Sequence, residues 1–436
     1  MEDNSNIFLK SILNENNNIS KNKTSKKYKL IKVPKRIPIK DNNKKKITKE
    51  NVNTNINKFV VKNTNIKKER NPGIDLVRLI AMYGTILNHI IYMKGVKRKY
   101  PQYSKNLKIL HIATGWHNDA FALISGIVGY KSNKYANLLY LWLFVSFYNV
   151  AIRLYFIKIR KEVVRNLDIS KYFFPIIYRR YWYFTAYFGM YLFLPAVNKG
   201  FTILKKYEFL LIVISTNFLF VYWRDLKNPN EDVFQMNRGV SVLWLFSFYF
   251  TGAYIGKYKV NYSGFKKYIF CFICIFIYLS TSYAFYKKIY NELYLGNGYY
   301  QRKIVSLLKQ ILKEGYDGIL KITNSFVVTL FFMRIHYNKY IAKFISFFGS
   351  LAFSIYIIHC NPFVSNIILA HSFDKEPYNL SRNSVLIKVS LHGLKILVTC
   401  LFIDVLRHLL FVILRIKKIC LFLENIMNKI LSKLIN

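Results

Sequence analysis

Residues 73–95 read GIDLVRLIAMYGTILNHIIYMKG, an apolar run long enough to cross a bilayer. The run nevertheless contains Arg78 and His89. A charged side chain in hydrocarbon costs about 2–3 kcal/mol or more unless the protein pairs it or uses it. Eleven residues at about 100° each bring His89 to within roughly 20° of the face that carries Arg78, about 16 Å further along the axis. One helix face is therefore predicted to carry a cation and a titratable base.

Asp75 precedes Arg78 by three residues, a spacing that predicts an ion pair on the same helix face near the start of the span. In the alternative interpretation, Arg78 reaches out to the lipid headgroups and His89 bonds to a neighbouring helix. The two residues together favour a functional site, because ionisable residues inside a membrane usually mark one.

The composition indicates the class of protein. The chain of 436 residues is 53% hydrophobic and 17% aromatic, yet it carries a formal net charge of +45. A soluble chain this basic would contain far fewer Phe, Ile and Leu, whereas here long apolar segments recur from residue 74 onward with basic residues between them. We therefore expect a multi-pass membrane protein whose partner is the lipid bilayer, and we expect no nucleic-acid partner.

The predicted fold class is all-α, a bundle of about ten transmembrane helices. Both chain ends are then expected in the cytosol, in a plasma membrane or an endomembrane. The ten predicted segments are 74–93, 108–130, 135–158, 181–200, 206–223, 240–256, 267–286, 318–334, 341–370 and 386–416.

The regions on either side of the bundle differ from it in composition. Residues 1–70 are rich in Asn and Lys and poor in aromatic residues, which predicts a disordered cytosolic tail. Residues 71–416 form the predicted transmembrane domain, and residues 417–436 form a basic cytosolic segment. The basic flank before the first span favours a cytosolic tail.

The five cysteines lie within or beside apolar segments. The pair in CFIC, residues 271–274, has no second Cys or His pair nearby that would complete a zinc site. We interpret all five as core thiols, and no metal is expected.

Four blocks of sequence, in order, resemble the acyltransferase 3 family of multi-spanning enzymes, which O-acylate carbohydrates. The first is Arg78 and His89, separated by ten residues in the first membrane helix. The others are DAFALISGIVGYK at 119–131, YWYFTAYFGMYLFLPAVNK at 181–199 and GSLAFSIYIIHCNPFV at 349–364. The last two are similar to the branch that acylates bacterial capsular polysaccharides and exopolysaccharides.

The resemblance implies transfer of an acyl group, most commonly acetyl, from acyl-coenzyme A to a hydroxyl of a carbohydrate or glycolipid. His89 is the candidate base, because a neutral imidazole can take the hydroxyl proton near physiological pH. Arg78, Lys131 and Lys134 are candidates for binding the phosphates of the donor on the cytosolic side. The donor's acyl group would then meet the acceptor inside the membrane.

The same resemblance supplies further candidates. Tyr356 and His359, three residues apart, are predicted to donate hydrogen bonds to the developing oxyanion. The predicted acceptor-binding residues are Asp119, Ser125, Tyr181 and Trp182. The aromatic residues would stack on a sugar, although membrane-interface aromatics have the same composition. Asp119 would orient His89 or bind a sugar hydroxyl.

The chain departs from the family pattern at two places. Cys360 follows His359 where the branch usually has an acidic residue, and Lys131 and Lys134 stand where the family often has an Arg pair. Lysine keeps the charge but loses the bidentate fork of arginine. Two alternatives stay open: a transporter or flippase for a charged or glycosylated lipid, whose route Arg78 and His89 would line, and an inactive scaffold with this fold.

Overall fold

The computed structural model describes residues 70–93, 95–158, 170–178, 180–223, 232, 234–258, 264–289 and 318–435. The chain divides into two units, Met1–Lys68 and Glu69–Asn436, and the described helices belong to the second. The tail predicted at 1–70 therefore lies almost wholly outside the described residues. Helix is the regular secondary structure throughout the described ranges, which confirms the all-α prediction.

The first membrane helix begins and ends at clear local signals. α3 spans Pro72–Asn88 and continues without a break as the π-helical turn η1, His89–Met93. The side-chain oxygen of Asn71 accepts hydrogen bonds from two N–H groups of the first turn, and a proline occupies the first helical position. Gly95, with φ at 79°, follows in the left-handed region. The span predicted at 74–93 is confirmed within two residues.

The other helices follow in chain order. In the first half they are α4 (Val96–Lys99), η2 (Pro101–Tyr103), α5 (Ser104–Thr114), α6 (His117–Gly129), α7 (Ala136–Lys158), α8 (Ser170–Phe173), α9 (Trp182–Ile203), α10 (Lys206–Asn217) and η3 (Phe218–Trp223). In the second half they are η4 (Asn237–Gly239), α12 (Val242–Lys257), α13 (Phe265–Ile289), α15 (Ile319–Phe332), α16 (Lys339–His359), η5 (Val364–Leu369), α17 (Arg382–Ile413) and α18 (Ile416–Ile435).

All ten predicted segments coincide with helices, but two of them are broken. Segment 108–130 is divided at Gly115 and Trp116 into α5 and α6, and segment 341–370 is divided after α16 by the turn before Pro362. Within the described ranges, five helices are long and apolar enough to cross a bilayer: Pro72–Met93, Ala136–Lys158, Phe265–Ala284, Lys339–His359 and Arg382–Ile413. The other predicted spans are shorter or less apolar.

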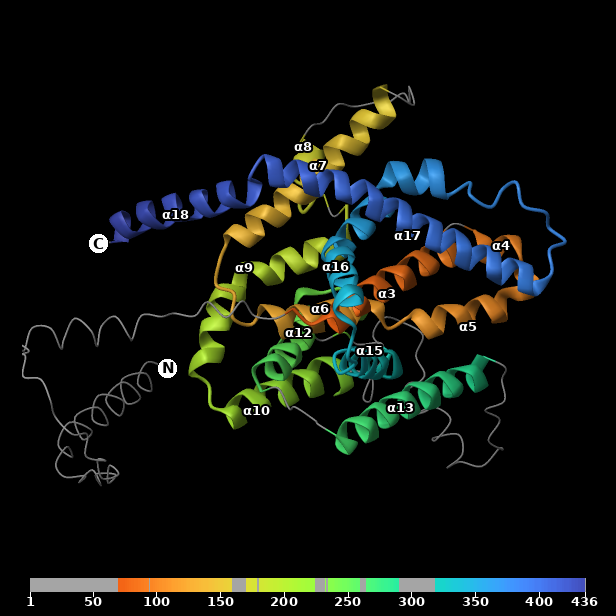
Figure 1. Ribbon diagram of the computed structural model, residues 1–436, viewed down its shortest axis with the longest axis horizontal. Helices are drawn as coiled ribbons and strands as arrows, with labels where there is room; N and C mark the ends of the chain where they lie inside the picture. The colour runs from red at the N-terminus through yellow and green to blue at the C-terminus, as the bar shows by residue number, and fades with distance from the viewer. Residues whose placement is uncertain are drawn as a thin grey trace, which may run out of the picture. The chain divides into compact units, whose positions relative to one another are not determined.

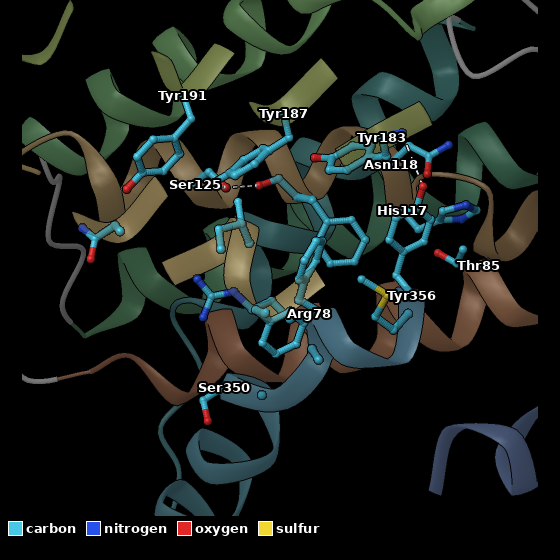
Figure 2. A pocket seen from close by; sticks show the side chains of 18 of the residues that line it. Arg78, Thr85, His117, Asn118, Ser125, Tyr183, Tyr187, Tyr191, Ser350 and Tyr356 are labelled. Atoms are coloured by element: carbon cyan, nitrogen blue, oxygen red, sulfur yellow. Dashed lines mark hydrogen bonds between the residues drawn. The ribbon is translucent and has the colours of Figure 1, made fainter. Parts of the chain in front are cut away.

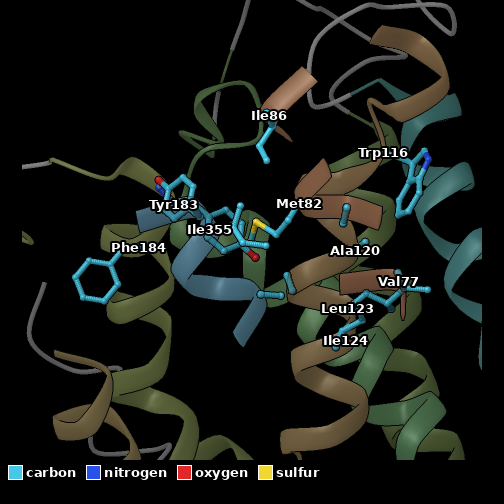
Figure 3. Close-up of a cluster of buried hydrophobic side chains, with 14 of the residues drawn as sticks. Val77, Met82, Ile86, Trp116, Ala120, Leu123, Ile124, Tyr183, Phe184 and Ile355 are labelled. Atoms are coloured by element: carbon cyan, nitrogen blue, oxygen red, sulfur yellow. The ribbon is translucent and has the colours of Figure 1, made fainter. Parts of the chain in front are cut away.

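α3 is the central helix of this unit, because it contacts α6, α15, α16 and α17 (Figure 1). Figure 3 shows part of the buried cluster around it, where Val77 and Met82 of α3 lie with Ala120 and Leu123 of α6 and Ile355 of α16. Small residues permit a close approach of α6 to α12. A Cβ at Gly126 would lie 2.1 Å from the carbonyl oxygen of Tyr249.

A buried ion pair within α17 is hydrogen-bonded to α7. Asp404 is fully buried and accepts from Arg407 at 2.7 and 2.8 Å. The hydroxyl of Tyr148 on α7 donates to the same carboxylate at 2.5 Å. The guanidinium also lies over the Phe144 ring, 4.6 Å from its centroid. A charge in this position is tolerated because its hydrogen-bonding groups have partners within the protein.

The outer faces of two helices are strongly apolar. On α13, Phe272, Phe276 and Leu279 are each more than half exposed, and so are Phe402 and Leu406 on α17. Lipid tails are as apolar as these side chains and supply the missing contacts. The described helices therefore form an integral membrane protein.

Candidate active site

A cavity of about 700 Å³ opens among α3, α6, α7, α9 and α16 (Figure 2). Five of the residues predicted from sequence line it: Arg78, His89, Ser125, Trp182 and Tyr356. In the close-up, Arg78 lies at one end and Tyr356 lies with His117 and Asn118 of α6 at the other. The structure thus brings five of the ten predicted site residues to one space inside the membrane domain.

One end of the cavity is cationic. The Asp75 carboxylate is 1% exposed and lies between two guanidinium groups. Arg70 donates to it through Nε at 2.5 Å and Nη2 at 2.7 Å, and Arg78 donates through Nη1 at 2.6 Å. The predicted ion pair between Asp75 and Arg78 is confirmed. Two cations share one carboxylate, so this group retains one net positive charge next to the cavity.

The approach of α16 to α3 depends on Gly349. A Cβ at this position would lie 2.4 Å from the Cβ of Asp75 and 2.8 Å from its carbonyl oxygen. Ten residues further along α16, His359 meets His89, the first residue of η1, which continues α3. The two helices therefore run in the same direction, and the glycine sets their separation at the cationic end.

Residues from the end of the chain complete the cationic end. Lys417, at the start of α18, and His408 of α17 line the cavity with Asn137 of α7. α17 runs antiparallel to α3, because Gly393 lies against Leu87 whereas the His408 ring lies near Phe347. The C-terminal end of α17 thus comes to the cationic end.

Three cationic side chains therefore line this end of the cavity: Arg70, Arg78 and Lys417. The sequence prediction missed Arg70 and Lys417, which it assigned to flanking basic segments. Lys417 is 339 residues from Arg78, and no local pattern connects the two.

The other end of the cavity contains a pair of histidines. His89 Nδ1 lies 3.0 Å from His359 Nε2, and their ring centroids are 5.0 Å apart. His89 lines the cavity, whereas His359 is 2% exposed and lines a second, more apolar cavity of about 950 Å³ between α7, η5 and α17. The histidine pair therefore lies between two cavities.

The hydrogen bonds determine which nitrogen carries each proton when both rings are neutral. His359 Nδ1 lies 2.5 Å from the carbonyl oxygen of Ile355, which can only accept, so Nδ1 is protonated. His359 Nε2 is then the acceptor and His89 Nδ1 the donor. This assignment leaves the lone pair of His89 on Nε2.

Cys360 lies against both rings. Its Sγ is 3.5 Å from His89 Nδ1 and 3.4 Å from His359 Nε2. The chain turns immediately after it, where Asn361 donates to Asn149 Oδ1 at 3.3 Å and to the Tyr181 hydroxyl at 3.1 Å. These two bonds are buried and fix the position of the turn.

Between the two ends, hydroxyl groups follow the cavity wall. Tyr187 donates to Ser125 Oγ at 3.3 Å, and Ser125 in turn donates to the carbonyl oxygen of Phe121 at 2.8 Å (Figure 2). The Tyr356 hydroxyl accepts from the backbone N–H of Tyr183 at 3.3 Å, so its own hydrogen can be donated elsewhere.

Two polar atoms of this wall are buried and have no hydrogen-bond partner among the described residues: the Tyr183 hydroxyl and Asn118 Nδ2. Both residues line the cavity. Buried polar groups are nearly always paired in folded proteins, so these two groups are available to hydrogen-bond with a polar ligand in the cavity. Neither Asn118 nor Tyr183 was among the site residues predicted from the sequence.

The other predicted site residues lie outside this lining. Asp119 is buried and accepts from Trp244 Nε1 at 3.0 Å. Tyr181 is buried and donates to Asn149 at 2.9 Å, so its hydroxyl supports the turn after α16. Lys131 and Lys134 are exposed on the connection between α6 and α7. Their predicted roles in binding acceptor and donor stay predictions.

Comparison with known families identifies the domain. Residues 71–381 match the Acyltransferase domain of acyltransferase 3 proteins. The chain belongs to the acyltransferase 3 family. This membrane acyltransferase has its histidine pair within the matched residues, whereas Arg70 and Lys417 lie outside them. No curated protein and no solved structure matches the chain.

Proposed function

We propose that this acyltransferase moves an acyl group, with acetyl as the proposed group, from acyl-coenzyme A to a hydroxyl of a carbohydrate or glycolipid. The observation that carries the proposal is that one cavity has cations at Arg78 and, further along the same helix, the histidine pair at His89. A donor with a phosphorylated head and a reactive acyl end needs both.

The cationic end suits the head of the donor. Arg70 and Arg78 retain one net positive charge after pairing with Asp75, and Lys417 adds another. Charge-assisted bonds to phosphate are about twice as strong as neutral ones. The acyl arm of coenzyme A would extend along the cavity over about 16 Å, the axial separation of Arg78 from His89 on α3. Lys131 and Lys134 would attract the donor from the surface.

In the proposed reaction, His89 Nε2 takes the proton of the acceptor hydroxyl as the oxygen attacks the thioester carbonyl. His359 Nε2 accepts from the His89 Nδ1–H, which holds the ring in place and favours the imidazolium as it forms. The tetrahedral intermediate collapses with loss of the coenzyme A thiolate, which takes the proton from His89. The products are the acyl ester and free coenzyme A.

The hydroxyl of Tyr356 is the proposed donor to the oxyanion. It lines the cavity, and its acceptor position is already used by the Tyr183 N–H. His359 does not serve this purpose in the neutral pair, because its N–H is directed to Ile355. The role assigned to His359 thus changes from donating to the oxyanion to positioning the base.

The acceptor is proposed to bind near the histidine end. The unpaired Asn118 amide and Tyr183 hydroxyl can bond to sugar hydroxyls, and Trp182 supplies an aromatic face in the same wall. Ser125 lies further along the cavity and would contact the acyl arm or the acceptor. With the cationic end toward the cytosol, the donor enters from that side and the acceptor from the opposite side.

The test is transfer of label from acetyl-coenzyme A to a glycan fraction by the full chain in proteoliposomes. We expect label in the glycan with the wild-type chain and none with His89→Gln. Movement of glycolipid across the bilayer without acyl-coenzyme A, and without labelled product, would instead favour a transporter. Mass spectrometry of cell-surface glycans with and without the gene product would then identify the acceptor.

A further inference from the structure

The histidine pair and Cys360 place three metal-binding atoms together. The three atoms are His89 Nδ1, His359 Nε2 and Cys360 Sγ, all within 4.8 Å of one another. The separations are 3.0 Å between the two nitrogens, 3.5 Å from sulfur to His89 and 3.4 Å from sulfur to His359. No local pattern predicts this cluster, because His359 and Cys360 lie 270 and 271 positions from His89.

These separations can be compared with a tetrahedral zinc site. With Zn–N at about 2.0–2.1 Å and Zn–S at about 2.3 Å, a tetrahedron requires about 3.3 Å between two nitrogens and about 3.6 Å between nitrogen and sulfur. The observed distances are shorter by about 0.1 to 0.3 Å. A small separation of the three side chains would therefore admit the ion, with a fourth position left for water.

The surroundings also fit a metal ligand set. His359 donates Nδ1–H to the Ile355 carbonyl oxygen, and ligating histidines commonly donate their second nitrogen in this way. The buried bonds of Asn361 fix the turn that carries Cys360. A thiolate and two imidazoles favour zinc and similar ions over Mg²⁺ and Ca²⁺, which prefer oxygen ligands.

We propose that His89, His359 and Cys360 form a binding site for Zn²⁺ and that the bound ion switches acyl transfer off. On binding, the Cys360 thiol releases its proton to solvent as the Zn–S bond forms. The His89 proton moves from Nδ1 to Nε2, so that Nδ1 can coordinate. Nε2 then has no lone pair with which to accept the acceptor's proton. The inhibitory half of this proposal rests on the proposed function, whereas the binding half does not.

Binding can be measured without any activity. We expect the purified full chain to take up one Co²⁺, as a spectroscopic substitute for Zn²⁺, with a thiolate-to-cobalt absorption band that excess Zn²⁺ removes. Cys360→Ser should lose the band and weaken Co²⁺ binding by more than the roughly 10–100-fold expected for an outer-shell partner. The matched control is Cys274→Ser, a buried cysteine on α13, which should keep both. A wild-type chain without the band would overturn the site.

A second measurement needs no variant. Cys360 is partly exposed, so a small thiol reagent should modify it, and Zn²⁺ should protect it. Cys271, also partly exposed, serves as the internal control and should react equally with and without zinc. Equal modification of Cys360 under both conditions would refute zinc binding even if Cys360→Ser failed to fold.

Inhibition is measured as turnover with Zn²⁺ divided by the same protein's turnover after chelation. The wild-type ratio should fall at least about tenfold below that of Cys360→Ser, and the chelator should restore turnover. If cobalt binds but zinc leaves turnover unchanged, the switch is wrong and the metal site stands. If the chain transfers no acyl group under any condition, the proposed function fails, and the cobalt band still decides whether the site exists.

Discussion

Replacement of His89 separates catalysis from packing, because its two ring nitrogens have different partners. In the neutral pair, Nδ1 donates to His359 and Nε2 carries the lone pair. His89→Ala removes both functions, whereas His89→Gln can restore the donor with its amide but cannot act as a base. The two variants should therefore differ in stability and agree in lost activity.

The expected magnitudes follow from this geometry. His359 is 2% exposed, so His89→Ala removes the imidazole donor to its buried Nε2, at a cost of about 1–3 kcal/mol in stability. His89→Gln should retain most of this stability, because its amide can donate to His359. Loss of a general base lowers turnover by about 10²–10⁴-fold, which corresponds to about 3–5 kcal/mol in the barrier. Both variants should show this loss.

The assay follows labelled acyl groups from acyl-coenzyme A to glycan in proteoliposomes, with thermal unfolding of the same samples measured in parallel. His89→Gln should unfold close to the wild-type temperature and transfer almost no label. Wild-type turnover by a stably folded His89→Gln chain would refute the base assignment and return the histidine to a packing role.

Three further changes test other parts of the structure. Lys417→Ala should raise the apparent KM for acyl-coenzyme A roughly tenfold, since a bond to a charged group contributes about 1.5–3 kcal/mol. Lys131→Ala alters an exposed charge and should raise the same KM less than about fivefold. Equal effects of the two variants would exclude Lys417 from the donor site. Gly349→Ala should destabilise the fold by about 1–3 kcal/mol, because the added methyl group clashes with α3. Gly200→Ala should leave stability unchanged, because a Cβ there meets nothing within 4 Å. Thermal unfolding compares the two variants. Asp404→Ala should lower the free energy of unfolding by about 3–5 kcal/mol, because it leaves the buried guanidinium of Arg407 unpaired. Replacing both Asp404 and Arg407 with Leu should recover much of this stability. A smaller loss of stability in Asp404→Ala would indicate that water reaches the pair.

Several features of the fold could be predicted locally. The first span was predicted within two residues because its apolar length lies within one short segment. The structure adds that an asparagine cap and a proline mark its start. The break at Pro362 was missed because the apolar pattern continues on both sides of it, although a proline often ends a helix. The helices α5 and α6 were predicted as one span, because the apolar pattern continues across the turn at Gly115 and Trp116.

The candidate site divides in a similar way. Arg78 and His89 could be singled out because charge within an apolar run is costly wherever the helix packs. The partner of His89 could not be derived from the spacing, which gives a face of one helix and says nothing about what meets it. Asp119 and Tyr181 show the converse, because their residue types suit a sugar site but their hydrogen bonds lead to Trp244 and Asn149.

The sequence by itself determined that this chain is an all-α membrane acyltransferase with an arginine and a histidine on its first span. Those conclusions depend on segment length, composition and motifs within short stretches, which are local properties of a chain. Only the tertiary structure decided that Lys417 joins Arg78, that His359 fixes the proton on His89, and that Cys360 completes a group of three metal-binding atoms. These arrangements join residues about 270 to 340 positions apart in the sequence. Shifts of a few tenths of an ångström in helix packing decide whether the contacts form, because hydrogen bonds and metal coordination weaken steeply with distance.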